Sequence, residues 1–251
     1  MDGTCHICGR YGRLSFEHVP PEKAFNNARA QIYGIDDYLK GSGLENLRGG
    51  RISQRGIGAH TLCIPCNNNT GAWYGPEYAY WAGTGAYILS NYPNFRGGSV
   101  TVLGCYPIRL LKQAVTMLCS VNPSSFAAER PDLVRFVLNK ENRAFPDYLH
   151  AQIGLYRGQI ARRIGFVALG NIATGTLRVL SEVAHPPLVF GFTLNCEPVP
   201  DLQVIDWFRQ YRYDQKADVT VEFAVCDGYT PFPSDYRGRD RVLEEAATRS
   251  R

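Results

Sequence analysis

Two Cys-x-x-Cys pairs near the N-terminus constrain this chain more than any other feature of its sequence. The first pair is Cys5 and Cys8, and the second is Cys63 and Cys66. Each pair places two thiols on one tight turn, and two such turns complete a tetrahedral sulfur cage suited to Zn²⁺. All four coordination positions would then be filled by sulfur, so we expect a structural zinc. Redox-active thiols are the alternative interpretation.

The other four cysteines occur singly among apolar neighbours, at Cys105, Cys119, Cys196 and Cys226. Buried, unreactive thiols of this kind are typical of a reducing compartment. The first residues lack a basic start followed by an apolar stretch, and no apolar run reaches eighteen residues. We therefore expect a cytoplasmic protein without a membrane partner.

An acidic residue directly precedes a histidine between the two cysteine pairs, at Glu17-His18. Adjacent side chains on a regular strand point to opposite sides, so only an irregular strand end would let both approach one site. Pro20 and Pro21 follow and would help to hold such an end. Taken alone, the doublet is usually a surface accident. Its context matters, because Asn67 comes immediately after the last paired cysteine.

With the two cysteine pairs, the Glu17-His18 doublet and Cys66-Asn67 in this order, the chain resembles the zinc-bearing HNH (ββα-metal, His-Me finger) endonucleases. Their pattern is Cys-x-x-Cys, an acid-His doublet on the first strand, then Leu-Cys-x-x-Cys-Asn entering the helix. The resemblance covers roughly residues 5–75. It says nothing about residues 76–251.

The resemblance implies a role for each matching residue. His18 corresponds to the general base that takes a proton from the attacking water, a role suited to an imidazole near neutral pH. Glu17 and Asn67 correspond to ligands of a catalytic divalent cation, which we expect to be Mg²⁺ or Mn²⁺. That cation would stabilise charge on the phosphate and on the leaving 3′-oxygen.

The match has a gap on the second strand. Many family members carry an Asn there that orients the general base, and the usual spacing places Gly58 at that position. His60 is the nearest polar candidate, and Gln54 is another. Either could orient His18, or His60 could join the catalytic metal site. His60 could equally be a surface histidine near the zinc, and the module could bind nucleic acid without cleaving it.

Four basic residues of this first part are candidates for gripping a nucleic-acid backbone: Lys23, Arg48, Arg51 and Arg55. A solvated, glycine-rich loop is the alternative interpretation of the arginines. The net charge of +4 permits a polyanionic partner but does not require one.

The pattern predicts an α+β protein in two parts. Residues 1–75 would form a small zinc-stapled ββα-metal module, and residues 76–251 a mixed domain of helices followed by a mostly antiparallel sheet. Pro76 predicts a helix start just after the boundary. Residues 107–120 predict an amphipathic helix. Its apolar face would hold Ile108, Leu111, Val115 and Leu118, and its polar face Arg109, Lys112, Gln113, Thr116 and Ser120.

Further along the chain, the period changes from helical to alternating. Residues 131–140 predict a second helix, and a helix over about 201–213 is expected to separate the last two strands. Five strands are predicted at residues 152–157, 163–169, 176–183, 188–194 and 218–225. From about residue 231 the composition predicts a loose tail.

The resulting expectation is a metal-dependent endonuclease that hydrolyses nucleic-acid phosphodiester bonds. Double-stranded DNA is the expected substrate because the resembling family mostly acts there; nothing in these residues excludes RNA. Residues 76–251 could bind an activating ligand or a protein partner. By analogy alone, such nucleases often serve in bacterial defence against phage. Two alternatives stay open, a non-catalytic nucleic-acid-binding zinc module and a protein-interaction scaffold.

Overall fold

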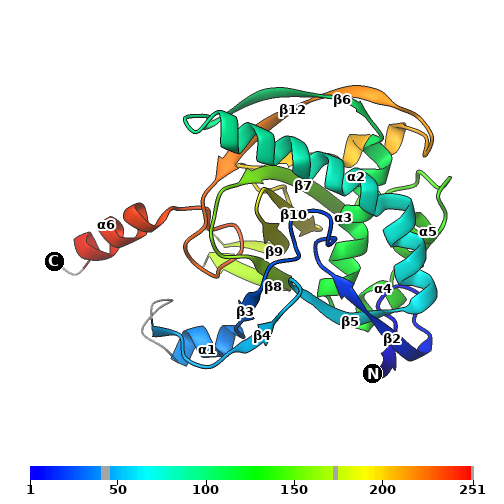
Figure 1. Cartoon of the computed structure of the whole chain (residues 1–251), viewed down its shortest axis with the longest axis horizontal. Helices are drawn as coiled ribbons and strands as arrows, with labels where there is room; N and C mark the ends of the chain where they lie inside the picture. Colours follow the sequence, from blue (N-terminus) through cyan, green and yellow to red (C-terminus); the bar gives the residue numbers. More distant parts are fainter. Residues whose placement is uncertain (41–45, 172–174, 250–251) are drawn as a thin grey trace.

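The computed structural model describes residues 1–40, 46–171 and 175–249 (Figure 1). The fold is α+β, as predicted, with a cysteine cluster near the N-terminus and a large, mostly antiparallel sheet. Its elements are, in order, β1 (Asp2–Thr4), β2 (Tyr11–His18), β3 (Ala30–Ile32), α1 (Ile35–Lys40), β4 (Arg51–Ser53), β5 (Gly58–Cys63), α2 (Ile64–Asn91), β6 (Gly97–Cys105), α3 (Pro107–Val121), α4 (Ser124–Ala128), α5 (Pro131–Leu138), β7 (Leu149–Tyr156), β8 (Arg162–Asn171), β9 (Thr176–His185), β10 (Leu188–Leu194), β11 (Gln203–Val204), the 3₁₀ helix η2 (Asp206–Gln210), β12 (Ala217–Cys226) and α6 (Arg239–Arg249).

The N-terminal part is built on the antiparallel sheet β1-β2-β5, and α2 begins directly after β5. The pairing of β2 with β5 contains an irregularity between Ser15 and Phe16, and β2 ends at His18. The irregularity thus precedes the Glu17-His18 doublet, whose own pairing with Ala59 and Gly58 is regular, and the doublet lies at the end of the strand. A separate two-stranded ribbon, β3-β4, carries α1 between its strands.

The large sheet has the strand order β6-β12-β7-β10-β9-β8, with the short β11 beside β7. All five predicted strands are present, and only the β12–β7 pairing is parallel among the pairings described for this sheet. The strand β6 was not predicted. The expected helix over residues 201–213 was wrong, because these residues contain β11 and the short η2 instead.

Helix α2 joins the two parts without a break. It runs from Ile64 to Asn91, so the predicted boundary at residue 75 falls inside it, and Pro76 lies within the helix and does not begin it. Buried residues from both sides of residue 75, among them Leu14 and Phe190, belong to one continuous hydrophobic core. The zinc-type module and the larger sheet thus share a core.

Helix α3 is central to that core. Its predicted apolar face is fully buried, as expected. The opposite, polar face is buried as well, including Lys112, Gln113, Thr116 and Ser120. An amphipathic pattern predicts a solvated polar face, but α3 packs between α2, α5 and the strands β5, β7, β8 and β9. Its polar side chains therefore face other parts of the protein.

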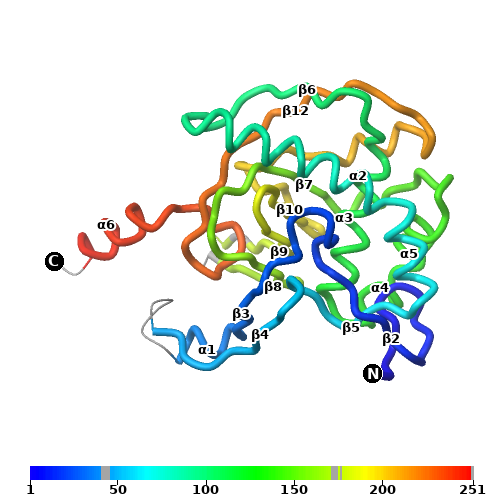
Figure 2. Tube along the Cα trace, in the orientation of Figure 1, coloured from blue at the N-terminus to red at the C-terminus, as the bar shows by residue number. Residues whose placement is uncertain are grey.

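The C-terminal segment is more ordered than the predicted tail. The buried guanidinium of Arg162 donates to the backbone oxygens of Thr230 and Asp235 and pairs with Glu182. Beyond this anchor, α6 extends away from the rest of the fold (Figure 2). No helix within the described residues is both long and apolar enough to cross a bilayer.

Candidate metal centre and active site

The four paired cysteines come together at the start of α2. Their Sγ atoms all lie within 4.8 Å of one another, and Cys8 Sγ is 3.7 Å from Cys63 Sγ. A tetrahedral zinc with Zn–S bonds of about 2.3 Å separates its sulfurs by roughly 3.8 Å. Disulfide sulfurs would be about 2.05 Å apart, and all four cysteines are free thiols. The cluster could hold a metal ion such as zinc.

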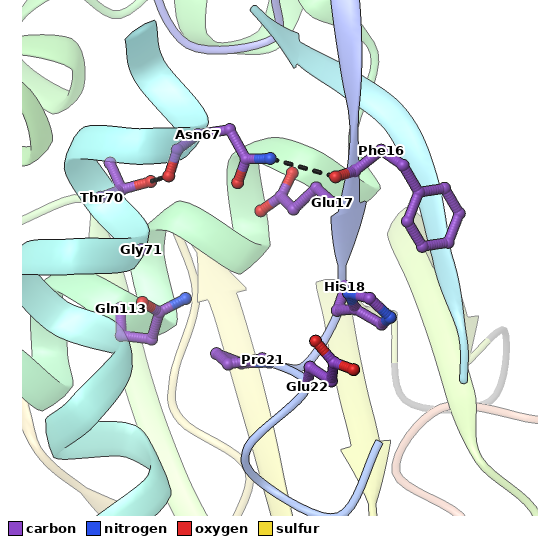
Figure 3. Close-up of a pocket in the computed structure, with 9 residues that line it drawn as sticks. All are labelled: Phe16, Glu17, His18, Pro21, Glu22, Asn67, Thr70, Gly71 and Gln113. Atoms are coloured by element: carbon purple, nitrogen blue, oxygen red, sulfur yellow. Dashed lines mark hydrogen bonds between the residues drawn. The ribbon is translucent and has the colours of Figure 1, made fainter. Parts of the chain in front are cut away.

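A pocket of about 170 Å³ lies beside this cluster (Figure 3). Glu17 and His18 reach it from the end of β2, and Asn67 reaches it from the first turn of α2. The remaining lining residues are Phe16, Pro21, Glu22, Thr70, Gly71 and Gln113. All three residues that the sequence marked as base and cation ligands therefore border the pocket, but only the Glu17 and Asn67 side chains point toward each other, whereas the His18 ring lies on the Phe16 side of β2 (Figure 3).

Glu17 is a buried carboxylate held by two hydroxyl groups. Thr61 Oγ1 donates to its Oε2 at 3.0 Å, and Ser120 Oγ donates to the same oxygen at 2.8 Å. Burial raises the pKa of the Glu17 carboxyl to about 7, although both hydroxyl bonds oppose the rise. No hydrogen bond from a described residue reaches Oε1. A desolvated carboxylate with one unbonded oxygen is well suited to a divalent cation.

Asn67 offers an amide oxygen to the same pocket. Its Nδ2 donates to Ser15 Oγ at 3.0 Å and to the backbone oxygen of Phe16 at 3.1 Å. These two bonds fix the orientation of the amide and leave Oδ1 as the free acceptor. Because Asn67 also follows Cys66 directly, the cysteine cluster determines where α2 presents this oxygen.

His18 has a defined tautomer. Its Nε2 lies 2.7 Å from the backbone oxygen of Arg55, and a carbonyl oxygen can only accept, so Nε2 carries the proton. Nδ1 is then left with a lone pair that can take a proton. The Phe16 ring packs edge-on against the imidazole at a centroid distance of 5.0 Å. The ring is thus held on two sides.

The geometry explains why glycine occupies the place of the expected Asn. Gly58 pairs directly with His18 across β2 and β5. A Cβ at Gly58 would lie 2.1 Å from the backbone oxygen of Glu17 and 2.6 Å from the Phe16 ring. No side chain fits there, and the Arg55 carbonyl orients the histidine in its place.

His60 lies outside the pocket. It pairs with Phe16 across β2 and β5, and its side chain is exposed. Its ring packs edge-on against the Phe16 ring at a centroid distance of 5.5 Å. His60 therefore does not lie with Glu17 and Asn67, and this arrangement does not support His60 as a ligand of a catalytic cation. Gln54, the other candidate, is exposed and does not line the pocket either.

The four basic candidates are all exposed: Lys23, Arg48, Arg51 and Arg55. Arg51 lies on β4 and is close enough to the half-buried Arg163 of β8 to help lower the pKa of that guanidinium, after burial as the main cause. Glu17 acts on Arg163 in the opposite direction. Positive charge from both parts of the chain therefore lies near the pocket.

Sequence reasoning missed the contributions of Thr61, Ser120, Gln113 and Glu22. Ser120 and Gln113 belong to α3, well beyond the end of the resembling segment at about residue 75, and nothing in their local pattern distinguishes them from solvated polar residues. Only the packing of α3 against β5 and α2 brings them to the pocket.

Searches of protein-family models, of curated proteins and of solved structures each returned no significant match to this chain.

Proposed function

We propose that the protein is a metal-dependent endonuclease with a structural zinc at the four cysteines. The observation that carries the proposal is that the Glu17 carboxylate and the Asn67 amide face one pocket, and that His18 borders the same pocket at the end of β2. A carboxylate and an amide oxygen can hold Mg²⁺ or Mn²⁺, and an imidazole can act as general base in the hydrolysis of a phosphodiester.

The residues divide the chemistry between them. His18 Nδ1 would accept the proton of an attacking water, and its Nε2–H bond to Arg55 would keep the ring in place while charge develops. Glu17 and Asn67 would hold the divalent cation through Oε1 and Oδ1. The cation supplies charge stabilisation at the phosphate and at the leaving oxygen. The exposed Lys23, Arg48, Arg51 and Arg55 would contact the nucleic-acid backbone.

The test is cleavage of plasmid DNA and of structured RNA by zinc-loaded protein, with and without Mg²⁺ or Mn²⁺. General-base assistance is typically worth about 10²–10⁴ in rate, so His18→Ala should nearly abolish cutting while zinc content and fold are retained. Glu17→Gln should remove the metal response. Absence of metal-dependent cutting of either nucleic acid would end the proposal.

A second candidate is a zinc module that binds nucleic acid without cutting it. Gly58 favours it, because the family's usual orienting side chain is absent. Duplex binding that falls steeply with salt, without cleavage under any metal condition, would select this candidate. We also propose a cytoplasmic location, a role in phage defence, and an activating ligand or protein partner for residues 76–251. The role in phage defence presupposes the nuclease activity.

A further inference from the structure

Gln113 is the one polar residue on the buried face of α3 whose side-chain oxygen has no partner among the described residues. Its side chain is 3% exposed, and nothing donates to its buried Oε1. By contrast, the Thr116 and Ser120 hydroxyls and the Lys112 ammonium on the same face all make hydrogen bonds. A buried amide oxygen left unpaired costs about 1–3 kcal/mol. Such a group calls for a partner that the protein chain does not supply.

The Gln113 amide lies at the wall of the pocket that also contains Glu17 and Asn67, with its nitrogen on the pocket side and its oxygen turned away (Figure 3). Those two residues each keep one oxygen free of described hydrogen bonds, Glu17 Oε1 and Asn67 Oδ1, as set out above. A half turn about the Cγ–Cδ bond of Gln113 exchanges its amide oxygen and nitrogen without moving another atom. Three residues from β2, α2 and α3 thus border one pocket, and each has a side-chain oxygen that accepts no described hydrogen bond.

Two protein oxygens are few for a hard divalent cation. Mg²⁺ and Mn²⁺ prefer octahedral oxygen coordination, and neutral amide oxygens serve as ligands alongside carboxylates. After the half turn of the Gln113 amide its oxygen faces the pocket, where a cation, or a water bound to it, would be its partner. We propose that Gln113 of α3 is a third protein oxygen ligand of the divalent cation held by Glu17 and Asn67. The inference rests on the cation site of the proposed function.

The proposal makes the site composite. Glu17 and Asn67 come from the segment that resembles a small nuclease module, whereas Gln113 comes from the part of the chain that the resemblance does not reach. With one carboxylate and two neutral amides, the three ligands together carry a single negative charge. A site with so little charge would bind its cation weakly and would gain affinity from a further carboxylate.

The experiment measures Mn²⁺ binding to the full, zinc-loaded chain by the loss of the free-Mn²⁺ electron paramagnetic resonance signal. Gln113→Leu, similar in size but without the amide, should weaken binding about tenfold or more. Gln113→Glu should tighten it, because it adds a carboxylate at the same place. Thr116→Val is the matched control, since it removes a buried polar group from the same helix away from the pocket. It should leave Mn²⁺ affinity unchanged.

Unchanged affinity in Gln113→Leu, or weaker binding in Gln113→Glu, would overturn the proposal and favour a contact of Gln113 with the nucleic acid. Absence of Mn²⁺ binding by the unaltered protein would overturn it too. If the leucine variant does not fold, the glutamate variant decides alone. Should the protein bind Mn²⁺ with the expected variant pattern but cut no nucleic acid, the proposed function fails while this ligand assignment stands.

Discussion

Ser120 donates a hydrogen bond of 2.8 Å to the carboxylate of Glu17, although the two residues lie 103 positions apart in the chain. The bond joins α3 in the core to the strand that carries the proposed catalytic doublet. Thr61 on β5 donates to the same carboxylate oxygen at 3.0 Å, and its hydroxyl oxygen lies 2.6 Å from that of Ser120. The carboxylate is therefore held in place by residues on both sides of the predicted boundary.

Replacing Ser120 with Ala should destabilise the fold through Glu17. A hydrogen bond to a charged group contributes about 1.5–3 kcal/mol, so the free energy of unfolding should fall by that amount in zinc-loaded protein without Mg²⁺ or Mn²⁺, at a pH above 7 where the Glu17 carboxyl is ionised. In a Glu17→Gln background the loss should be smaller, because the amide is neutral. Chemical denaturation of the two single variants and the double variant measures the coupling. Purely additive losses would contradict the expected dependence on charge.

Loss of one zinc ligand should affect the whole protein. Cys63→Ser should reduce bound zinc from one per chain to nearly none, measured by elemental analysis. Because α2 starts at the cysteine cluster and continues into the shared core, we expect one earlier thermal transition of the entire chain. Cys196→Ser, a half-buried cysteine outside the cluster, is the control. A large C-terminal part that melts at its original temperature would show that the two parts are independent.

His60→Ala tests whether His60 is a surface residue or a member of the catalytic site. Because the His60 ring is exposed and lies outside the pocket, cleavage by this variant should stay close to that of the unaltered protein. His18→Ala, measured in parallel, should lose about 10²–10⁴ in rate. A comparable loss in both variants would place His60 in the catalytic machinery after all.

Lys112 should give the stability a distinctive dependence on pH. Its ammonium is fully buried and donates to the backbone oxygens of Phe136, Asn139 and Asn142. Burial lowers the pKa of Lys112 to about 7 from 10.5. Between these values the unfolded chain binds the proton more tightly, so the free energy of unfolding should rise with pH over this range.

The control is Lys112→Met, which cannot titrate and leaves the three carbonyls without their donor. It should be less stable than the unaltered protein by about 1–3 kcal/mol per carbonyl that stays unpaired. The difference in stability between the two proteins, measured by denaturation at pH 7 and at pH 9.5, should widen as the pH rises. An equal difference at both pH values would mean that Lys112 stays charged in the folded state.

Local chemistry made much of the N-terminal part predictable. The spacing of the paired cysteines predicts the metal cluster. Glu17 and His18 are adjacent in the sequence, and Asn67 directly follows the last cysteine, so the candidate site could be predicted from residues close to one another or to the cluster. The strands from β7 to β10 were predictable as well, because the period of their apolar residues changes from helical to alternating. β6 was not predicted because its sequence begins with two glycines, which adopt positive φ, and because only Val102 and Cys105 of its residues are fully buried, which leaves little apolar pattern.

The second layer of the site could not be predicted. Ser120 and Gln113 occupy the polar face of an amphipathic pattern, which indicates solvent unless other elements cover it. Whether α2 and β5 cover that face depends on contacts between residues far apart in sequence. The sequence of α3 alone contains no information on those contacts, so the polar face was expected to be exposed.

The bond from His18 to the Arg55 carbonyl has a consequence for how mutations are tolerated. A main-chain acceptor survives any side-chain replacement at position 55, so the orientation of the imidazole is insensitive to substitution there. The sensitive positions are those that fix the loop: Gly56, whose Cβ would lie 2.0 Å from the Asn26 backbone oxygen, and Asn26, whose amide bonds both the N–H and the oxygen of Ile57. In a saturation screen for folding stability, position 55 should therefore be permissive and positions 26 and 56 nearly invariant.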